Sequence, residues 1–250
     1  MNYLVRSKAI LPRPRPWTVA RPEQYTSRQK ELDVVTRRYC VAWLSASGEA
    51  NNRTMVAPAV PAFEQAFNAF AQGTLIQTGH GKVAVEDLKP GDQIATADGG
   101  LQPLMWIGSM TLFPQQGDLG LSSAQLYRIT ENIFGLDRSS PDLMLGAAAR
   151  LLPGLFAVDS SSNLVDIGDL ADGHSVVMVR PMSAVRTFHL GLVGHRLIRA
   201  NGVACESFHP GEYPHLEHSP EMFDIYMSLF PHVKSADDFG PLFHKRTSAR

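Results

Sequence analysis

Short apolar runs separated by turn signals fill the chain between residues 73 and 211. Typical runs are residues 74–78, 93–96 and 103–107. Short segments rich in Gly, Asp and Pro lie between them. Short runs with many β-branched or aromatic side chains favour strands, and Gly and Asp residues between them favour turns. The pattern predicts a mainly β domain built from many short strands.

Three other segments carry helix signals. Phe63, Phe67 and Phe70 are four and three residues apart, which predicts a short helix with its apolar side in the core. Residues 130–135 predict another short helix that ends at a glycine. Residues 219–220, a serine followed by a proline, are typical of a helix start. Apolar residues at helical spacing follow this start: Met222, Ile225, Tyr226, Leu229 and Phe230.

The beginning of the chain is basic and contains alternating prolines. Residues 1–39 hold nine Lys or Arg and three acidic residues, although the whole chain has a net charge of −1. Prolines alternate with other residues over 11–17, which favours an extended path. We interpret residues 1–36 as an arm. Residues 37–60 predict a β-hairpin, because two runs of β-forming residues flank a turn that contains Ser and Gly.

The basic arm admits two interpretations. It is either a solvated tail, which we favour, or a contact for nucleic acid or another anionic partner. The residues that would make such contacts are Arg13, Arg15, Arg37 and Arg38.

Composition excludes several classes of protein. Hydrophobic residues make up 44% and charged residues 19% of the chain, which is enough to bury a core. No apolar run is long enough to span a membrane, and no secretory leader is recognisable, so we expect a cytoplasmic protein, with leaderless secretion left open. Cys40 and Cys205 are the only cysteines, which excludes a disulfide scaffold and a zinc site built on thiolates.

Five blocks occur in a recognisable order. They are residues 69–76 with Phe-x-x-Gly-Thr, 85–94 with Val-Glu-Asp-Leu, 102–108 with Gln-Pro-x-x-Trp-Ile-Gly, 187–202 with a closing Ala-Asn-Gly, and 206–211 with Glu-Ser-Phe-x-Pro-Gly. Together they resemble bacterial members of the Hint (Hedgehog/intein) family. The resemblance implies an all-β, Hint-like domain at 61–211, preceded by the arm and the hairpin and followed by a helical tail at 212–250.

The resemblance also implies which positions carry the chemistry of the family. There, a thiol or hydroxyl before Phe-x-x-Gly-Thr attacks the preceding carbonyl, a His in the second block assists, and inteins end in His-Asn. The matching positions here are Ala69, Ala149, Glu206 and Ser207, and His189 stands where the closing block often has Asp or His. A methyl group cannot act as a nucleophile. We therefore expect a degenerate domain that has lost autoproteolysis and splicing, and that serves as a structural or protein-interaction module for an unknown protein partner.

The alternative to this interpretation is residual self-cleavage. Thr74 retains a hydroxyl, and His189 and His195 could act as bases. Because position 69 offers no nucleophile for a base to activate, we expect both histidines to be packed between strands.

Clustered histidines near the end of the chain could bind a metal. His209, His215 and His218 lie close together in sequence with acidic residues nearby, which is compatible with a nitrogen and oxygen site. The spacing matches no known ligand signature. We interpret these side chains as surface histidines and expect neither a metal nor a cofactor.

Overall fold

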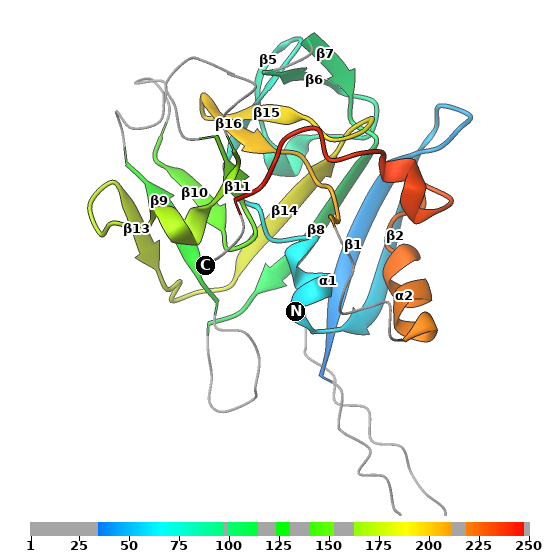
Figure 1. The fold of residues 1–250 in the computed structure, drawn as a ribbon, viewed down its shortest axis with the longest axis horizontal. Helices are drawn as coiled ribbons and strands as arrows, with labels where there is room; N and C mark the ends of the chain where they lie inside the picture. Colours follow the sequence, from blue (N-terminus) through cyan, green and yellow to red (C-terminus); the bar gives the residue numbers. More distant parts are fainter. Residues whose placement is uncertain are drawn as a thin grey trace, which may run out of the picture.

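The computed structural model describes residues 35–97, 100–114, 124–130, 141–152, 163–211 and 219–247. These residues form a mainly β fold of two antiparallel sheets, with a short helix near the C-terminal end (Figure 1). The fold class predicted from the sequence is confirmed. No helix in the described ranges is both long and apolar enough to cross a membrane.

The first sheet has the strand order β13-β9-β10-β3-β14-β8-β1-β2. Two of its strands, β1 and β2, form an antiparallel hairpin in the segment where the sequence predicts one, and β1 also pairs with β8. The hairpin therefore widens the sheet. The bounds are β1 Thr36–Leu44, β2 Ala50–Pro58, β3 Phe70–Ala71, β8 Trp106–Leu112, β9 Leu126–Ile129, β10 Leu143–Gly146, β13 Val176–Val179 and β14 Val185–Gly191.

The second sheet has the strand order β12-β11-β16-β15-β4-β6-β7, and β5 pairs with β4. Asn201 and Gly202 turn the chain between β15 and β16, both with positive φ, of 48° and 94°. Asn and Gly tolerate this left-handed conformation better than other residues. The bounds are β4 Leu75–Thr78, β5 Gly81–Ala84, β6 Gln93–Thr96, β7 Gly100–Pro103, β11 Arg150–Leu151, β12 Val165–Asp166, β15 Leu197–Ala200 and β16 Val203–Glu206.

The first predicted helix is shorter than expected. Helix α1 spans Pro61–Gln65, whereas Phe70 already belongs to β3. Phe63 and Phe67 are fully buried, so the spacing of the phenylalanines predicts core positions correctly. It does not predict where the helix ends. Three 3-10 segments complete the connections: η2 Val85–Asp87, η3 Ile167–Leu170 and η4 Ala236–Phe239.

The C-terminal helix begins where the sequence predicts. Helix α2 spans Pro220–Met227, and the Ser219 hydroxyl accepts a hydrogen bond from the Met222 backbone N–H at 3.4 Å. Tyr226 is buried, but Ile225 is 39% exposed, so one member of the predicted apolar stripe faces solvent. The helix predicted at 130–135 falls almost entirely outside the described residues.

Two apolar cores lie on opposite faces of the first sheet. One core contains Phe70 and Phe188 and extends to side chains of the second sheet. The other gathers Trp106 with the residues that follow α2, and the Trp106 indole N–H donates to the Leu229 carbonyl at 2.9 Å. Burial of aromatic side chains therefore fixes the C-terminal helix to the sheet.

We predict that Leu229→Ala lowers the free energy of unfolding by about 2–5 kcal/mol, because it removes a fully buried side chain and leaves a cavity. The matched control is Ile225→Ala, which removes a half-exposed apolar side chain from the preceding turn and should cost much less. Urea unfolding of both variants measures the difference. Equal losses would mean that the segment after α2 is not anchored as described.

Candidate functional site

Backbone hydrogen bonds with three other residues hold the peptide bond between Asn68 and Ala69 in place. The Ala69 N–H donates to the Phe188 carbonyl at 3.0 Å. The Asn68 carbonyl accepts from the Ala148 N–H at 2.9 Å, and the Ala69 carbonyl accepts from the Gly146 N–H at 2.8 Å. Ala69 is only 1% exposed. This bond is therefore rigidly placed, and its carbonyl already has an N–H donor.

Small residues allow the turn at 146–149 to lie against this bond. A Cβ atom on Gly146 would come within 2.3 Å of the Asn68 backbone oxygen and 2.7 Å of its carbonyl carbon. Only glycine fits at such a distance. Ala149 at the end of the turn is also buried, and its carbonyl accepts a hydrogen bond from the Ile167 N–H at 3.0 Å.

Three positions singled out by the sequence lie in or next to the segments that hydrogen-bond to this peptide bond. Ala69 contributes its N–H and carbonyl, Ala149 closes the turn that contacts them, and His189 directly follows the residue whose carbonyl binds Ala69. The side chains of Ala69 and Ala149 belong to the same apolar core.

His189 is buried among aromatic rings. Its ring lies 5.2 Å from that of Phe208 and 6.1 Å from that of Phe70. Burial lowers its pKa from 6.5 to about 4, against the opposing effects of Glu206 and of a hydrogen bond with the backbone of Gln65. The ring is neutral at pH 7. Its Nδ1 atom and the Oδ1 atom of Asn68 are both buried and find no hydrogen-bond partner among the described residues.

Glu206 is the centre of a buried charge network. Its Oε1 accepts from His195 Nε2 at 2.7 Å and from Arg246 Nε at 2.8 Å, and its Oε2 accepts from Arg150 Nη1 at 3.3 Å. Arg150 also pairs with Asp166 at 2.8 Å. Burial by itself would raise the pKa of Glu206, but the hydrogen bonds from His195 and Arg246 outweigh it and lower the pKa to about 2.

The hydrogen bonds of His195 determine which of its nitrogens carries the proton. Its Nδ1 accepts from the backbone N–H groups of Phe243 at 3.0 Å and His244 at 3.3 Å. An acceptor nitrogen has no proton, so the proton is on Nε2, where it is donated to Glu206.

Ser207, next to Glu206, makes its hydrogen bonds with the backbone of Arg196. Its hydroxyl accepts from the Arg196 N–H at 2.9 Å, and its own N–H donates to the Arg196 carbonyl at 2.8 Å. It is fully buried. Thr74, the other hydroxyl considered from the sequence, donates to the Ala71 carbonyl at 2.7 Å.

Of the arginines considered for partner binding, the structure describes Arg37 and Arg38. Arg37 is 6% exposed and pairs with Glu64 at 2.7 Å, so this side chain belongs to the core and the expectation that it faces a partner is corrected. Arg38 is exposed. Arg13 and Arg15 lie outside the described residues.

His209 has partners for both ring nitrogens. Its Nε2 lies 2.9 Å from the Gly240 carbonyl, and its Nδ1 accepts from the Gly211 N–H at 3.0 Å. His215 and His218 lie outside the described residues. In the described ranges, no group of three or more His, Cys, Asp or Glu side chains is arranged to hold a metal ion.

No motif in the sequence predicted the network around Glu206. An acidic residue within an apolar strand segment such as 203–208 is the one signal that could have indicated a buried charge. Nothing marked Arg246, at the far end of the chain, as its partner.

Comparisons with known proteins find one family profile and several similar structures. A sequence profile of the Hint domain matches residues 68–212. The solution structure of a bacterial intein-like domain from Clostridium thermocellum is similar over 56% of this chain and 99% of that chain, with 13% identity and a TM-score of 0.40. The gp41-1 intein is similar over 56% and 98%, with 12% identity and a TM-score of 0.34. The MchDnaB-1 intein is similar over 56% and 100%, with 14% identity and a TM-score of 0.31. No curated protein matches the sequence.

We predict that the buried His189 makes the fold sensitive to acid. Its pKa of about 4 in the folded state lies below the ordinary 6.5, so the unfolded chain binds the proton more strongly between these values. The stabilisation is complete above pH 6.5 and falls by on the order of 3 kcal/mol as the pH drops to 4. Denaturant unfolding at several pH values should show this slope, and His189→Gln should reduce it.

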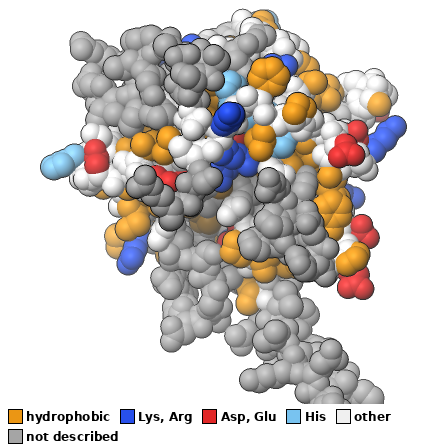
Figure 2. All heavy atoms as spheres, viewed as in Figure 1, with side chains coloured by type: hydrophobic (Ala, Val, Ile, Leu, Met, Phe, Trp, Pro, Cys, Tyr) orange, Lys and Arg blue, Asp and Glu red, His pale blue; other side chains and the backbone are white. Residues whose placement is uncertain are grey.

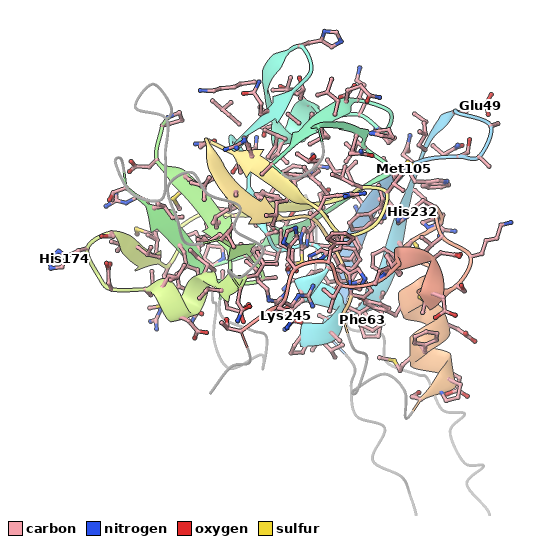
Figure 3. All side chains as sticks on the ribbon, turned by 45° about the horizontal axis from the view of Figure 1, so that its top comes forward. Glu49, Phe63, Met105, His174, His232 and Lys245 are labelled. Carbon is pink, nitrogen blue, oxygen red and sulfur yellow. The ribbon has the colours of Figure 1, made fainter. Side chains whose placement is uncertain are left out.

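The control for this measurement is His174→Gln. His174 is exposed and points away from the molecule at one end (Figure 3), so its removal should leave the pH slope unchanged. His232 is half-buried, and burial lowers its pKa to about 4, so it contributes to the slope that stays in His189→Gln. An unchanged slope in His189→Gln would contradict the assignment.

Proposed function

The chain belongs to the Hint domain family, and we propose that its Hint domain has lost self-processing and serves as a structural or protein-interaction module. We propose the same division of the chain as the sequence suggests: a basic arm at 1–36, a hairpin at 37–60, the Hint domain at 61–211 and a helical tail at 212–250.

The observation that carries this proposal is the Asn68–Ala69 peptide bond. Self-processing in the family needs a side-chain sulfur or oxygen at position 69 that forms a bond to the Asn68 carbonyl carbon. The peptide C–N bond then breaks, and the nitrogen of residue 69 takes up a proton. The bond is buried and its carbonyl accepts the Ala148 N–H, but the side chain at 69 is a methyl group without a lone pair.

The other positions support the same conclusion. Ala149 has no group that could exchange a proton with this bond. His189 is neutral and could accept a proton, but no nucleophile stands at position 69 for it to activate. Glu206 and Ser207 hold structural hydrogen bonds to His195 and Arg196.

Elements outside the matched region support a role as a module. The hairpin β1–β2 pairs with β8 of the Hint domain, and α2 and its following residues cover one face of the same sheet (Figure 1). A processing domain needs free access for its flanking chain, whereas these flanking segments are built into its core. This arrangement favours a stable, permanent scaffold.

We predict that Ala69→Cys combined with Ala149→His restores slow, thiol-dependent cleavage after Asn68. The new thiol would lie beside a carbonyl that already has a hydrogen-bond donor, and the new imidazole would assist proton transfer. Intact-mass measurement over days with added thiol should detect the N-terminal fragment. The unmodified chain should stay at 27.4 kDa.

The matched control is Ala71→Cys combined with Ala149→His. Ala71 is equally buried two residues further along, but the carbonyl before it belongs to β3 and lies outside the contact with the turn. No fragment should form. Cleavage of the unmodified chain after Asn68 would overturn the proposal that self-processing is lost.

A further inference from the structure

Residues 240–247, which we call the strap, run from η4 across the end of the second sheet towards β11, in red in Figure 1. The strap belongs to the helical tail, follows α2 and η4, and lies over the network around Glu206. Figure 2 views this face, where Lys, Arg and His side chains gather near the centre with hydrophobic side chains beside them.

The strap is bound through its backbone at three places, one of which is the Gly240 carbonyl, 2.9 Å from His209 Nε2. The Leu164 N–H donates to the Lys245 carbonyl at 2.7 Å, and the Thr247 N–H donates to the Leu164 carbonyl at 2.8 Å, as in a parallel strand pair. The Nδ1 atom of His195 accepts the N–H groups of Phe243 and His244. These contacts do not depend on which side chains the strap carries.

One strap side chain enters the domain. Arg246 donates from Nε to Glu206 at 2.8 Å and from Nη2 to the His209 carbonyl at 2.6 Å. The two bonds leave the guanidinium in different directions, towards a carboxylate and a backbone oxygen. A planar guanidinium can make both bonds at once, whereas a lysine ammonium is a single point charge on a flexible stem.

Apolar contacts contribute little to holding the strap. Leu242 is 40% exposed and Phe243 is 70% exposed, and neither belongs to an apolar core. The strap is held instead by hydrogen bonds and by the ion pair between Arg246 and the buried Glu206 carboxylate, which is costly to leave without a partner. A ligand that replaces the strap must therefore supply the same hydrogen bonds and the same cation.

We propose that the surface under the strap is a peptide-docking site, and that an extended, arginine-containing segment of a partner protein binds there in place of the strap. The proposal rests on the role of the domain as an interaction module and names the chemistry of its partner. The Nδ1 acceptor of the His195 ring and the backbone N–H and carbonyl of Leu164 fit an added strand. The buried carboxylate of Glu206 selects arginine.

The test uses the full chain and a fluorescent peptide with the sequence of residues 240–247. Arg246→Glu places a negative charge against Glu206 and should release the strap. Lys245→Glu makes the same charge change on the neighbouring exposed side chain and serves as the control. We expect Arg246→Glu to bind the peptide at least ~10-fold more tightly than the control or the unmodified chain, because a tethered strap competes at an effective concentration of about millimolar.

Changes in the peptide test the role of the arginine. Replacing its arginine by alanine should weaken binding to the Arg246→Glu chain at least ~10-fold, and replacement by lysine should weaken it as well. Equal binding of the arginine and alanine peptides would overturn the proposal. So would equal binding of the peptide to all three chains.

A measurement on the unmodified chain covers the case in which Arg246→Glu does not fold. Backbone hydrogen exchange should be faster in the strap than in β15 and β16, since release of the strap needs no unfolding of the sheet. Equal protection of the strap and these strands would overturn the proposal. None of these readouts involves cleavage after Asn68. A negative result would therefore count against the peptide-docking site alone, whereas cleavage of the unmodified chain would count against the proposed function.

Discussion

The carboxylate of Glu206 determines where three distant segments of the chain meet. A buried charge without partners is strongly destabilising, so cations and N–H donors must surround it. They come from Arg150 after the turn at 146–149, from His195 within the closing block, and from Arg246 near the C-terminal end. Apolar side chains tolerate small displacements against each other. Hydrogen bonds to the two oxygens of one carboxylate do not, and they fix the register of all three segments.

This network also stabilises the geometry around the Asn68–Ala69 bond. Arg150 directly follows the turn, so the network holds the turn in place. The N–H groups of Gly146 and Ala148 in this turn donate hydrogen bonds to the Ala69 and Asn68 carbonyls, just before β3. Strand β3 is only two residues long and joins β10 to β14. Without these extra hydrogen bonds the first sheet would be interrupted. The contacts that could polarise a carbonyl are therefore required by the fold itself.

Local sequence signals predicted the parts of this structure that depend on local physics. Turn residues predicted where strands end, and Ser219 predicted the start of α2, because caps and turns depend on only a few neighbouring residues. The helix around Phe63 was predicted too long, because buried aromatic spacing continues into β3. Arg37 was predicted on the surface, since its partner Glu64 becomes adjacent only in the folded chain. Of the candidate site, the family motifs indicated the positions around residue 69, but the partners of Glu206 depend on tertiary contacts alone.

The C-terminal tail divides into two parts by the forces that hold them. After α2, fully buried Leu229 and Phe230 anchor the chain to the sheet through apolar burial, which has no strong directional requirement and is large. The strap that follows is held by directional hydrogen bonds and one ion pair, which discriminate between ligands. A segment that another peptide replaces needs this second kind of attachment. The anchor before it keeps the released strap close to its site, so that release is reversible.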